Sequence, residues 1–225
     1  MSFLAGGRFT GNDARPCGRP LPRALIPIAG AALVMAALLA LSACGVRSAP
    51  PPPGPGWERG GVPELRGTTV LVLPVQASGV GSPGTVDAEL RFALESRGPS
   101  VRWMAGAELE TLARQAGRLG ADPNALPVAI FEMGEVERVG DPLFGAIYRL
   151  GAIADARFAI LPVAARVQAS EEDPGRVRAH LNVALLDTRS GRVLWQGILE
   201  GAPGAVDSPA LIASMAERVA ARLLP

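Results

Sequence analysis

Apolar residues divide the chain into an uncharged hydrophobic run at residues 24–43, a proline-rich stretch at 49–56, and a long segment with strand and helix patterns. The long segment starts with residues 68–75, which are almost all aliphatic or β-branched and do not alternate with polar residues. This pattern is typical of a strand that is covered on both faces. Pro74 should mark its end, because proline cannot donate a hydrogen bond to the sheet.

Two helices and a second strand follow. Residues 86–96 have apolar positions at helical spacing, with Thr85 as a candidate N-cap and Gly98 beyond the end. Residues 101–104 predict a short strand, and residues 107–116 predict a helix that Gly117 stops. These segments indicate a βαβα unit. The inward positions of its helices are Val86, Leu90, Ala93, Leu94, Leu109 and Leu112.

Residues 120–140 have the least regular pattern, and residues 128–131 fit either a short strand or an apolar lid. A third helix is clearer. Asp141 is a candidate N-cap, and Pro142 follows at the first position, where a missing N–H costs nothing. The apolar stripe of this helix is Leu143, Ile147, Leu150 and Ala154.

Three strands in succession follow, at residues 158–167, 177–186 and 193–199. The turns at residues 173–175 and 187–191 favour an antiparallel meander. A last helix begins with Pro209 and carries a stripe of Leu211, Met215, Val219 and Leu223. The predicted fold class is therefore α/β (α+β), a mixed sheet with an N-terminal βαβα unit, an antiparallel three-strand meander and a C-terminal helix.

Domain organisation follows from composition. Residues 44–66 read as a proline- and glycine-rich linker, which at about 3.1 Å per residue would hold a domain up to about 60 Å from its attachment point. Residues 67–225 are enough for a single domain with its own core. This part contains no cysteine, so it has neither a disulfide nor a cysteine-based metal site.

Charge gives no indication of a nucleic-acid partner. The whole chain has 22 basic and 21 acidic residues. Residues 1–43 contain four of the basic and one of the acidic residues, so 18 basic and 20 acidic residues remain beyond them. A near-neutral balance lacks the basic patch that binds phosphate backbones.

The hydrophobic run ends in Leu41-Ser42-Ala43-Cys44-Gly45, and four arginines precede it. Basic residues before an apolar run are typical of a secretory signal. The small residues before Cys44 resemble the processing site of bacterial lipoproteins. The resemblance implies residues 1–43 as a signal peptide, cleavage between Ala43 and Cys44, and lipid attachment, with palmitate among the acyl chains, at Cys44. The alternative is an uncleaved membrane-spanning helix at residues 24–43, which Pro27 and Gly30 disfavour.

Both interpretations place the domain outside the cytoplasm. Gly45, rather than aspartate, follows Cys44. This resembles the outer-membrane sorting signal of enteric bacteria. The expected location is therefore the cell envelope, as a membrane-anchored lipoprotein of the outer membrane that faces the periplasm.

The element order and two local motifs resemble one superfamily of envelope proteins. The motifs are Leu-Gly-Ala-Ile-Ala-Asp-Ala-Arg at residues 150–157, before a strand, and Leu-Leu-Asp-Thr-Arg-Ser-Gly-Arg-Val-Leu-Trp at residues 185–195, in a hairpin. The superfamily is the α/β domain shared by the TolB amino-terminal domain, lipoprotein activators of penicillin-binding proteins, the curli secretion lipoprotein and the exopolysaccharide lipoprotein PelC. Its members are non-catalytic and act by contact with other envelope proteins or by assembling into rings.

The resemblance implies a lipid-anchored, non-catalytic protein that serves as an interaction, activator or scaffold domain in envelope assembly or secretion. Its expected partners are membrane lipid, through acylated Cys44, and an envelope protein, and a homo-oligomer is one form of assembly. It implies no cofactor.

One motif supports a different class of function, an exported enzyme or a nucleotide-responsive module that uses the Gly79–Gly84 loop. Residues 79–84 read Gly-Val-Gly-Ser-Pro-Gly, the glycine pattern that brings backbone amides to a pyrophosphate in dinucleotide sites. Four residues separate Pro74 from Gly79, no acidic residue lies near position 100, and Thr85 stands where a P-loop has lysine. These departures favour a flexible structural loop.

Other residue types give no catalytic constellation. His180 is the only histidine, and strand alternation places it with Arg178 and Asn182 on a solvated face. No serine lies in a G-x-S-x-G motif. The acidic residues Glu132, Glu135, Glu137 and Asp141 are spaced as in a solvated loop, with a cation or a basic partner as the alternative. We therefore expect no catalytic, cofactor-binding or metal-binding residue.

Overall fold

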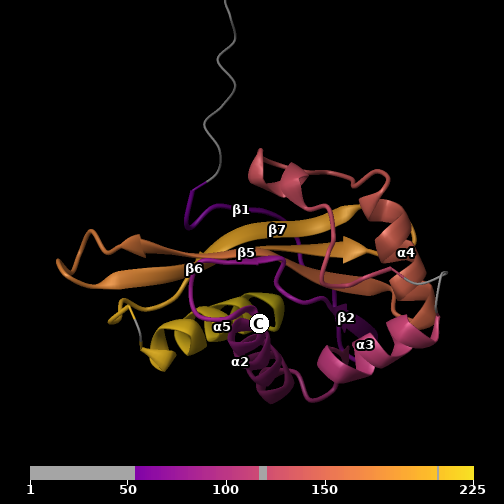
Figure 1. Cartoon of the computed structure of the whole chain (residues 1–225), viewed down its shortest axis with the longest axis horizontal. Coiled ribbons are helices and arrows are strands. Elements are labelled where there is room, and N and C mark those ends of the chain that lie inside the picture. The colour runs from indigo at the N-terminus through magenta and orange to yellow at the C-terminus, as the bar shows by residue number, and fades with distance from the viewer. Residues whose placement is uncertain (1–53, 117–120, 207) are drawn as a thin grey trace, which may run out of the picture. The chain divides into compact units, whose positions relative to one another are not determined.

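The computed structural model describes residues 54–116, 121–206 and 208–225, which form a seven-stranded mixed sheet with helices on both faces (Figure 1). The strands are β1 (Glu58–Gly60), β2 (Thr69–Val72), β3 (Ala77–Ser78), β4 (Arg102–Met104), β5 (Phe158–Ala169), β6 (Val177–Asp187) and β7 (Val193–Glu200). The helices are α2 (Pro83–Arg97), α3 (Gly106–Gln115), α4 (Leu143–Ile153) and α5 (Pro209–Leu223), with a 3-10 turn η2 (Ala129–Glu132).

The sheet confirms the predicted fold class. Its strand order is β1-β7-β6-β5-β2-β4, and β3 pairs with β5 off this path. Strand β2 is parallel to both β4 and β5, as the βαβα unit requires. Strands β5, β6 and β7 form the antiparallel meander, and α5 closes the chain.

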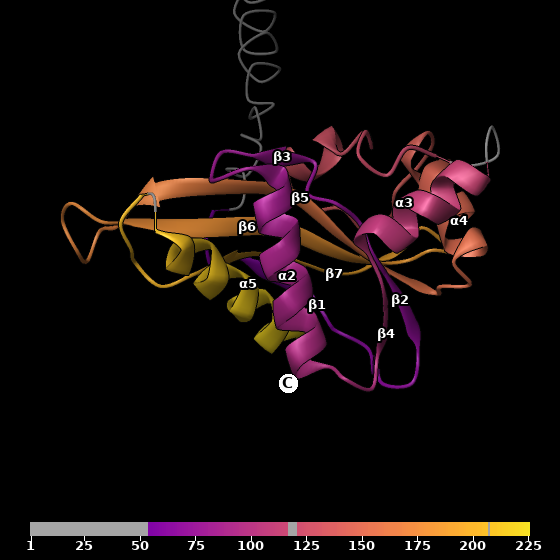
Figure 2. The same ribbon diagram turned by 60° about the horizontal axis from the view of Figure 1, so that its bottom comes forward.

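Each face of the sheet packs against its own apolar layer. Helices α2 and α5 lie side by side on one face (Figure 2), where Leu181, Val183 and Leu185 of β6 meet Met215 and Val219 of α5. Helices α3 and α4 cover the β2 end of the opposite face. Two buried faces explain why β2 has an uninterrupted apolar sequence.

The first helix begins earlier than the sequence analysis placed it. Ser82 is the N-cap, and its Oγ accepts a hydrogen bond of 3.2 Å from the backbone N–H of Thr85. Pro83 fills the first helical position, where proline fixes a helical φ and no N–H is needed. The prediction of Thr85 as the cap was therefore wrong by one turn, because Ser82 and Pro83 were assigned to the glycine loop.

The sheet also extends into residues that the sequence analysis assigned to the linker. Strand β1 pairs antiparallel with β7, and the backbone N–H of Gly56 already donates to Ile198 O at 2.8 Å. Leu65 is only 2% exposed and belongs to the core beneath α2 and α5. The folded part therefore includes residues 54–66. The high glycine and charge content of residues 54–66 gave no strand pattern, so the short edge strand β1 was not predicted.

Side-chain amides hold the irregular segment before α4 against the sheet. Gln76 donates to Pro123 O at 2.9 Å and accepts from Leu126 N at 2.8 Å. Asn182 of β6 donates to the carbonyl of Phe131, and Gln196 of β7 accepts from Val136 N. These bonds replace regular pairing, so the predicted strand at residues 128–131 is absent, and Ala129–Glu132 form η2 with a buried Phe131.

Candidate functional site

The lipid-attachment and cleavage residues predicted from the sequence, Ala43 and Cys44, lie outside the described residues. They remain predictions. Among the helices of residues 54–116, 121–206 and 208–225, none has the length and apolar character of a membrane span.

The glycine loop is packed into the domain. The backbone N–H of Gly79 donates to Ala165 O at 2.8 Å, which extends the short pairing of β3 with β5. Gly81 has φ of +60°, and a Cβ there would lie 2.8 Å from Cδ1 of Ile212 on α5. The prediction of a flexible loop was therefore too loose, since this turn contacts both the sheet and a helix. Positive φ and close packing account for Gly81 without a ligand.

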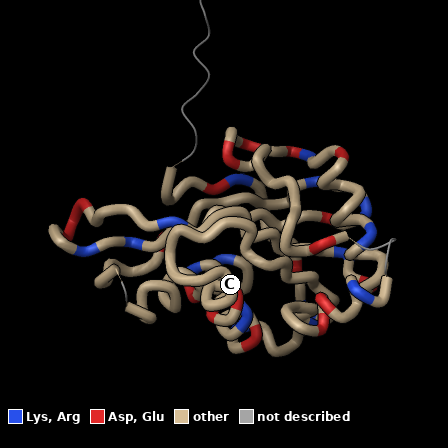
Figure 3. The backbone as a smooth tube through the Cα atoms, viewed as in Figure 1, with Lys and Arg blue, Asp and Glu red and all other residues tan. Residues whose placement is uncertain are grey.

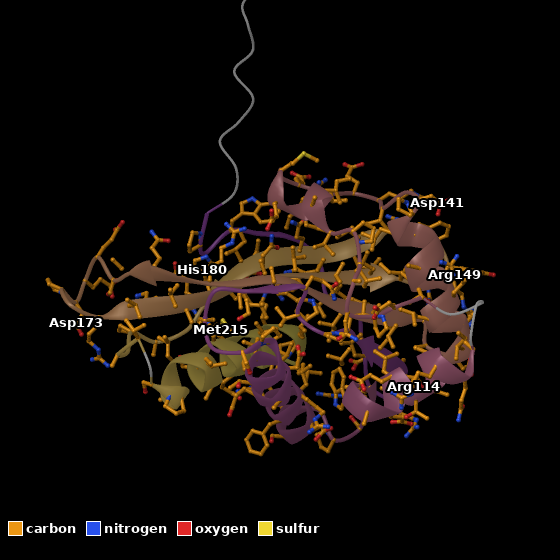
Figure 4. All side chains as sticks on the ribbon, viewed as in Figure 1. Arg114, Asp141, Arg149, Asp173, His180 and Met215 are labelled. Carbon is orange, nitrogen blue, oxygen red and sulfur yellow. The ribbon has the colours of Figure 1, made fainter. Side chains whose placement is uncertain are left out.

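His180 is half-buried and lines a cavity, whereas strand alternation predicted a solvated face. Residues around Pro55 and η2 cover that side of β6, while Met215 of α5 lies against the opposite face (Figure 4). Nδ1 of His180 and Oδ1 of Asn182 are buried and have no hydrogen-bond partner in the part of the chain that the structure describes. Burial lowers the pKa of the imidazole below its ordinary value, an effect that Glu200 opposes and Arg166 reinforces.

His180 also lacks the neighbours that catalysis would require. The cavity beside it has a volume of about 240 Å³. Arg166 and Glu132, which line this cavity, pair with each other at 2.7 Å. No described serine or carboxylate hydrogen-bonds to the imidazole, so the histidine has no nucleophile or orienting acid. Nδ1 of His180 and Oδ1 of Asn182 are also inaccessible to water, which argues against direct contact of these atoms with a bound molecule.

The acidic residues between Glu132 and Asp141 do not converge. Glu135 and Glu137 pair with Arg59 of β1, while Glu132 pairs with Arg166 of β5. Asp141 instead accepts a hydrogen bond of 3.0 Å from Gly145 N in the first turn of α4. Consistent with this, the described residues contain no cluster of three potential metal ligands.

Charge is spread over the molecule rather than collected in one patch. Acidic residues gather at the tip of the β5–β6 hairpin, while basic and acidic residues alternate elsewhere (Figure 3). At the tip, Asp173 pairs with Arg176, and Glu172 pairs with Arg178. Basic side chains are therefore interspersed with acidic ones over the part of the chain that the structure describes.

A cavity that the sequence did not reveal opens at the carboxyl end of β2. It has a volume of about 230 Å³ and lies between α2 and α3. Val72, Leu73 and Leu90 supply apolar walls, and Asp87 and Arg91 supply charge. Strand β2 pairs with β4 on one side and with β5 on the other, so the chain connections diverge at this edge of the sheet. Ligands of α/β proteins often bind at such positions.

Asp87 is the residue of this cavity whose pKa is shifted. Its Oδ1 accepts a hydrogen bond of 2.7 Å from the backbone N–H of Val75. Burial raises the pKa of the Asp87 carboxyl above its ordinary value, and the bond from Val75 only partly offsets this effect. Perturbed groups in clefts are often functional. The only sequence signal for this site was an acidic and a basic residue four positions apart on a predicted helix.

Comparisons with known proteins give structural likeness only. No protein family model matches the sequence, and no curated protein matches it. Among solved structures, a PelC dodecamer from Paraburkholderia phytofirmans is 14% identical, with a TM-score of 0.37, over 72% of this chain and 94% of that chain. The LpoB C-terminal domain from Salmonella enterica is 14% identical, with a TM-score of 0.38, over 62% and 86%.

Lipoprotein GNA1162 from Neisseria meningitidis is 16% identical, with a TM-score of 0.34, over 63% of this chain and 84% of that chain. The similar structures thus include members of the superfamily that the sequence resembles. At these identities and TM-scores the likeness carries no argument about function, which has to rest on the chain itself.

Proposed function

We propose that this chain is a lipid-anchored, non-catalytic envelope protein that acts through contact with another envelope protein, at the periplasmic face of the outer membrane. The observation that supports this most is the short stretch of sequence between the lipobox at residues 41–44 and Gly56, the first residue that hydrogen-bonds to the sheet. An acylated Cys44 would hold the folded domain beside the bilayer.

The tether is shorter than the sequence analysis suggested. Residues 44–54 span at most about 35 Å when fully extended. The reach of about 60 Å assumed that the linker ran to residue 66, but residues 56–60 lie along β7. A domain on this tether would be restricted to partners in, or close to, the same membrane.

A firmly held apolar surface beside the chain's entry suits such a partner. Met133 is 76% exposed and Ile130 is 39% exposed, and both belong to the segment around η2. Asn182 and Gln196 fix the backbone of this segment to the sheet. A backbone that is already held loses little further backbone entropy on binding, which favours a docking role.

The described residues give no support to the enzymatic alternative. His180 has no catalytic neighbour, and the tight contact of Gly81 with Ile212 explains the glycine motif. Asp87 lies one turn into α2, and its carboxylate would repel a phosphate placed at the start of that helix. The interaction role therefore accounts for more of the structure.

Site-specific photo-crosslinking in the native host tests this proposal. A photoreactive residue at position 133 should give a discrete larger species in the membrane fraction, and the product should be lost in Cys44→Ala. A photoreactive residue at position 92 is the matched control, because Phe92 is 69% exposed but lies on α2, away from η2. Absence of any product at position 133, or equal products at both positions, would contradict the proposed docking role.

A further inference from the structure

The cavity at the end of β2 contains two opposite charges that do not meet. Asp87 and Arg91 are four residues apart on α2, so their side chains leave the same face of the helix. Both line the cavity, yet Arg91 forms its ion pair with Glu95 rather than with Asp87. Asp87 instead bonds to Val75 N, and Nε of Arg91 lies 4.0 Å from Glu95.

Arg91 extends towards the neighbouring helix. A Cβ built on Gly106, the first residue of α3, would lie 3.5 Å from a guanidinium nitrogen of Arg91. Glu110, one turn further along α3, also lines the cavity. The guanidinium therefore lies at the mouth between the two helices, while the Asp87 carboxylate is anchored beside Val75 at the strand end.

The half-buried charge of Asp87 is unfavourable for folding. A carboxyl group with a raised pKa contributes stability below its unfolded pKa and loses that contribution as pH rises. At neutral pH, ionised Asp87 therefore works against the folded state. Its recorded partner among the described residues is the backbone N–H of Val75, while Arg91 pairs with Glu95. A partly buried ionisable group with a shifted pKa in a cleft is a candidate binding group.

We propose that this cavity binds a small zwitterion, a free α-amino acid with an apolar side chain. Its ammonium group would pair with Asp87, its carboxylate would pair with Arg91, and its side chain would lie against Val72, Leu73 and Leu90. An α-amino acid carries its ammonium and carboxylate groups on one carbon, which matches an acidic and a basic side chain one helical turn apart, the basic one held only by a 4.0 Å contact with Glu95. The site is independent of the lipid anchor and of the η2 surface.

The chemistry of the cavity excludes closely related ligands. A phosphate would face the Asp87 carboxylate with Arg91 as the only cation among the lining residues, and Glu110 would add a second repulsion. A simple amine would leave Arg91 without a ligand contact. A ligand with both charges would contact both α2 side chains over an apolar floor.

Calorimetric titration of the purified mature protein in detergent with L-leucine tests the proposal. We expect saturable binding, with N-acetyl-L-leucine and L-leucinamide binding at least about tenfold more weakly, because each lacks one charged group. Asp87→Asn and Arg91→Gln should each weaken the binding of L-leucine by a similar factor. Glu89→Gln is the matched control, since it removes a charge from α2 at a position that does not line the cavity.

The variants also separate binding from folding. Asn at position 87 retains an oxygen that can accept from Val75 N, so Asp87→Asn should melt no lower than wild type at pH 7. Absence of L-leucine binding at millimolar concentrations would overturn the proposal. So would equal binding of the three ligands by wild type, or unchanged L-leucine affinity in a folded Asp87→Asn protein. None of these results would affect the crosslinking test of the partner surface.

Discussion

The indole Nε1 of Trp195 donates a hydrogen bond of 3.2 Å to Oε2 of Glu58, which joins the last strand of the meander to the first strand of the chain. The same carboxylate pairs with Arg222 of α5, whose guanidinium lies 5.6 Å from the centre of the Trp195 ring. Trp195 is fully buried. Residues 58–60 are therefore part of the structure that encloses the central tryptophan.

A domain that starts at Gly67 should be markedly less stable than one that starts at Gly54. The shorter form loses the pairing of β1 with β7 and the burial of Leu65. We expect a loss of about 3 kcal/mol or more in the free energy of unfolding, measured by urea denaturation. Equal midpoints would show that β1 contributes nothing to the fold.

Trp195→Ala should lower the free energy of unfolding by about 3–5 kcal/mol, because it removes a fully buried aromatic ring and leaves a cavity. Trp57→Ala is the comparison. Trp57 is half-buried, and its recorded hydrogen bonds are from the backbone: its N–H donates to Gly54 O at 3.2 Å and its carbonyl accepts from Ile198 N at 2.8 Å. Its loss should therefore be much smaller, and equal thermal shifts for the two variants would contradict the placement of the core.

The glycine loop offers a comparison within six residues. Gly81→Ala should cost about 1 kcal/mol or more, because alanine at φ of +60° is strained and its Cβ would meet Ile212. Gly84→Ala should be neutral or slightly stabilising, since Gly84 lies in the first turn of α2 with nothing within 4 Å of a built Cβ. Thermal denaturation should therefore show a loss of stability for Gly81→Ala alone. If the loop bound a ligand through its backbone, both substitutions would weaken ligand binding.

Local pattern predicted most of the sheet and helices, because their signals lie within one element. The uninterrupted apolar run of β2 and the stripe of α5 are examples. Strand β1 could not be predicted in this way, since Glu58-Arg59-Gly60 has no apolar period and pairs only because the β7 edge is available. For the same reason, the partial burial of His180 could not be predicted. It depends on side-chain amides of β6 and β7 that hydrogen-bond to the segment around η2, which is distant in sequence.

The cavity site shows a related limit. Asp87 and Arg91 have the spacing of an ordinary surface ion pair, and sequence alone favours that interpretation. Their separation and the burial of Asp87 arise only when β2, α2 and α3 meet.

Asp187 should make the domain sensitive to acid. Burial raises the pKa of its carboxyl, but hydrogen bonds from Ser190, Arg157 and Arg189 outweigh burial and hold the pKa below its ordinary value. Such a group stabilises the fold above its unfolded pKa of about 3.9, and this contribution disappears as pH falls through the folded pKa. Asp187→Asn should therefore be less stable than wild type at pH 7, by about 1–2 kcal/mol. The gap should close below about pH 4, and a constant gap across this range would refute the assignment.

His180 should give a second pH dependence of the unfolding free energy, in this case because burial disfavours the charged form of its side chain. Its pKa is lowered in the folded state by burial, so the unfolded chain binds the proton more readily. Stability should then fall as pH decreases below about 6.5, until the folded pKa is passed. His180→Gln should remove this slope in unfolding free energy between about pH 5 and 7. An unchanged slope would show that the imidazole is as accessible as in the unfolded chain.

The most direct test of the proposed envelope role is the chemical state of Cys44 in protein purified from its native membrane. Tryptic digestion followed by mass spectrometry should yield residues 44–47 as a peptide that carries a diacylglycerol on Cys44 and begins at that residue. A peptide of residues 24–47, uncut before Cys44 and with a free thiol, would contradict the lipid anchor and the account built on it.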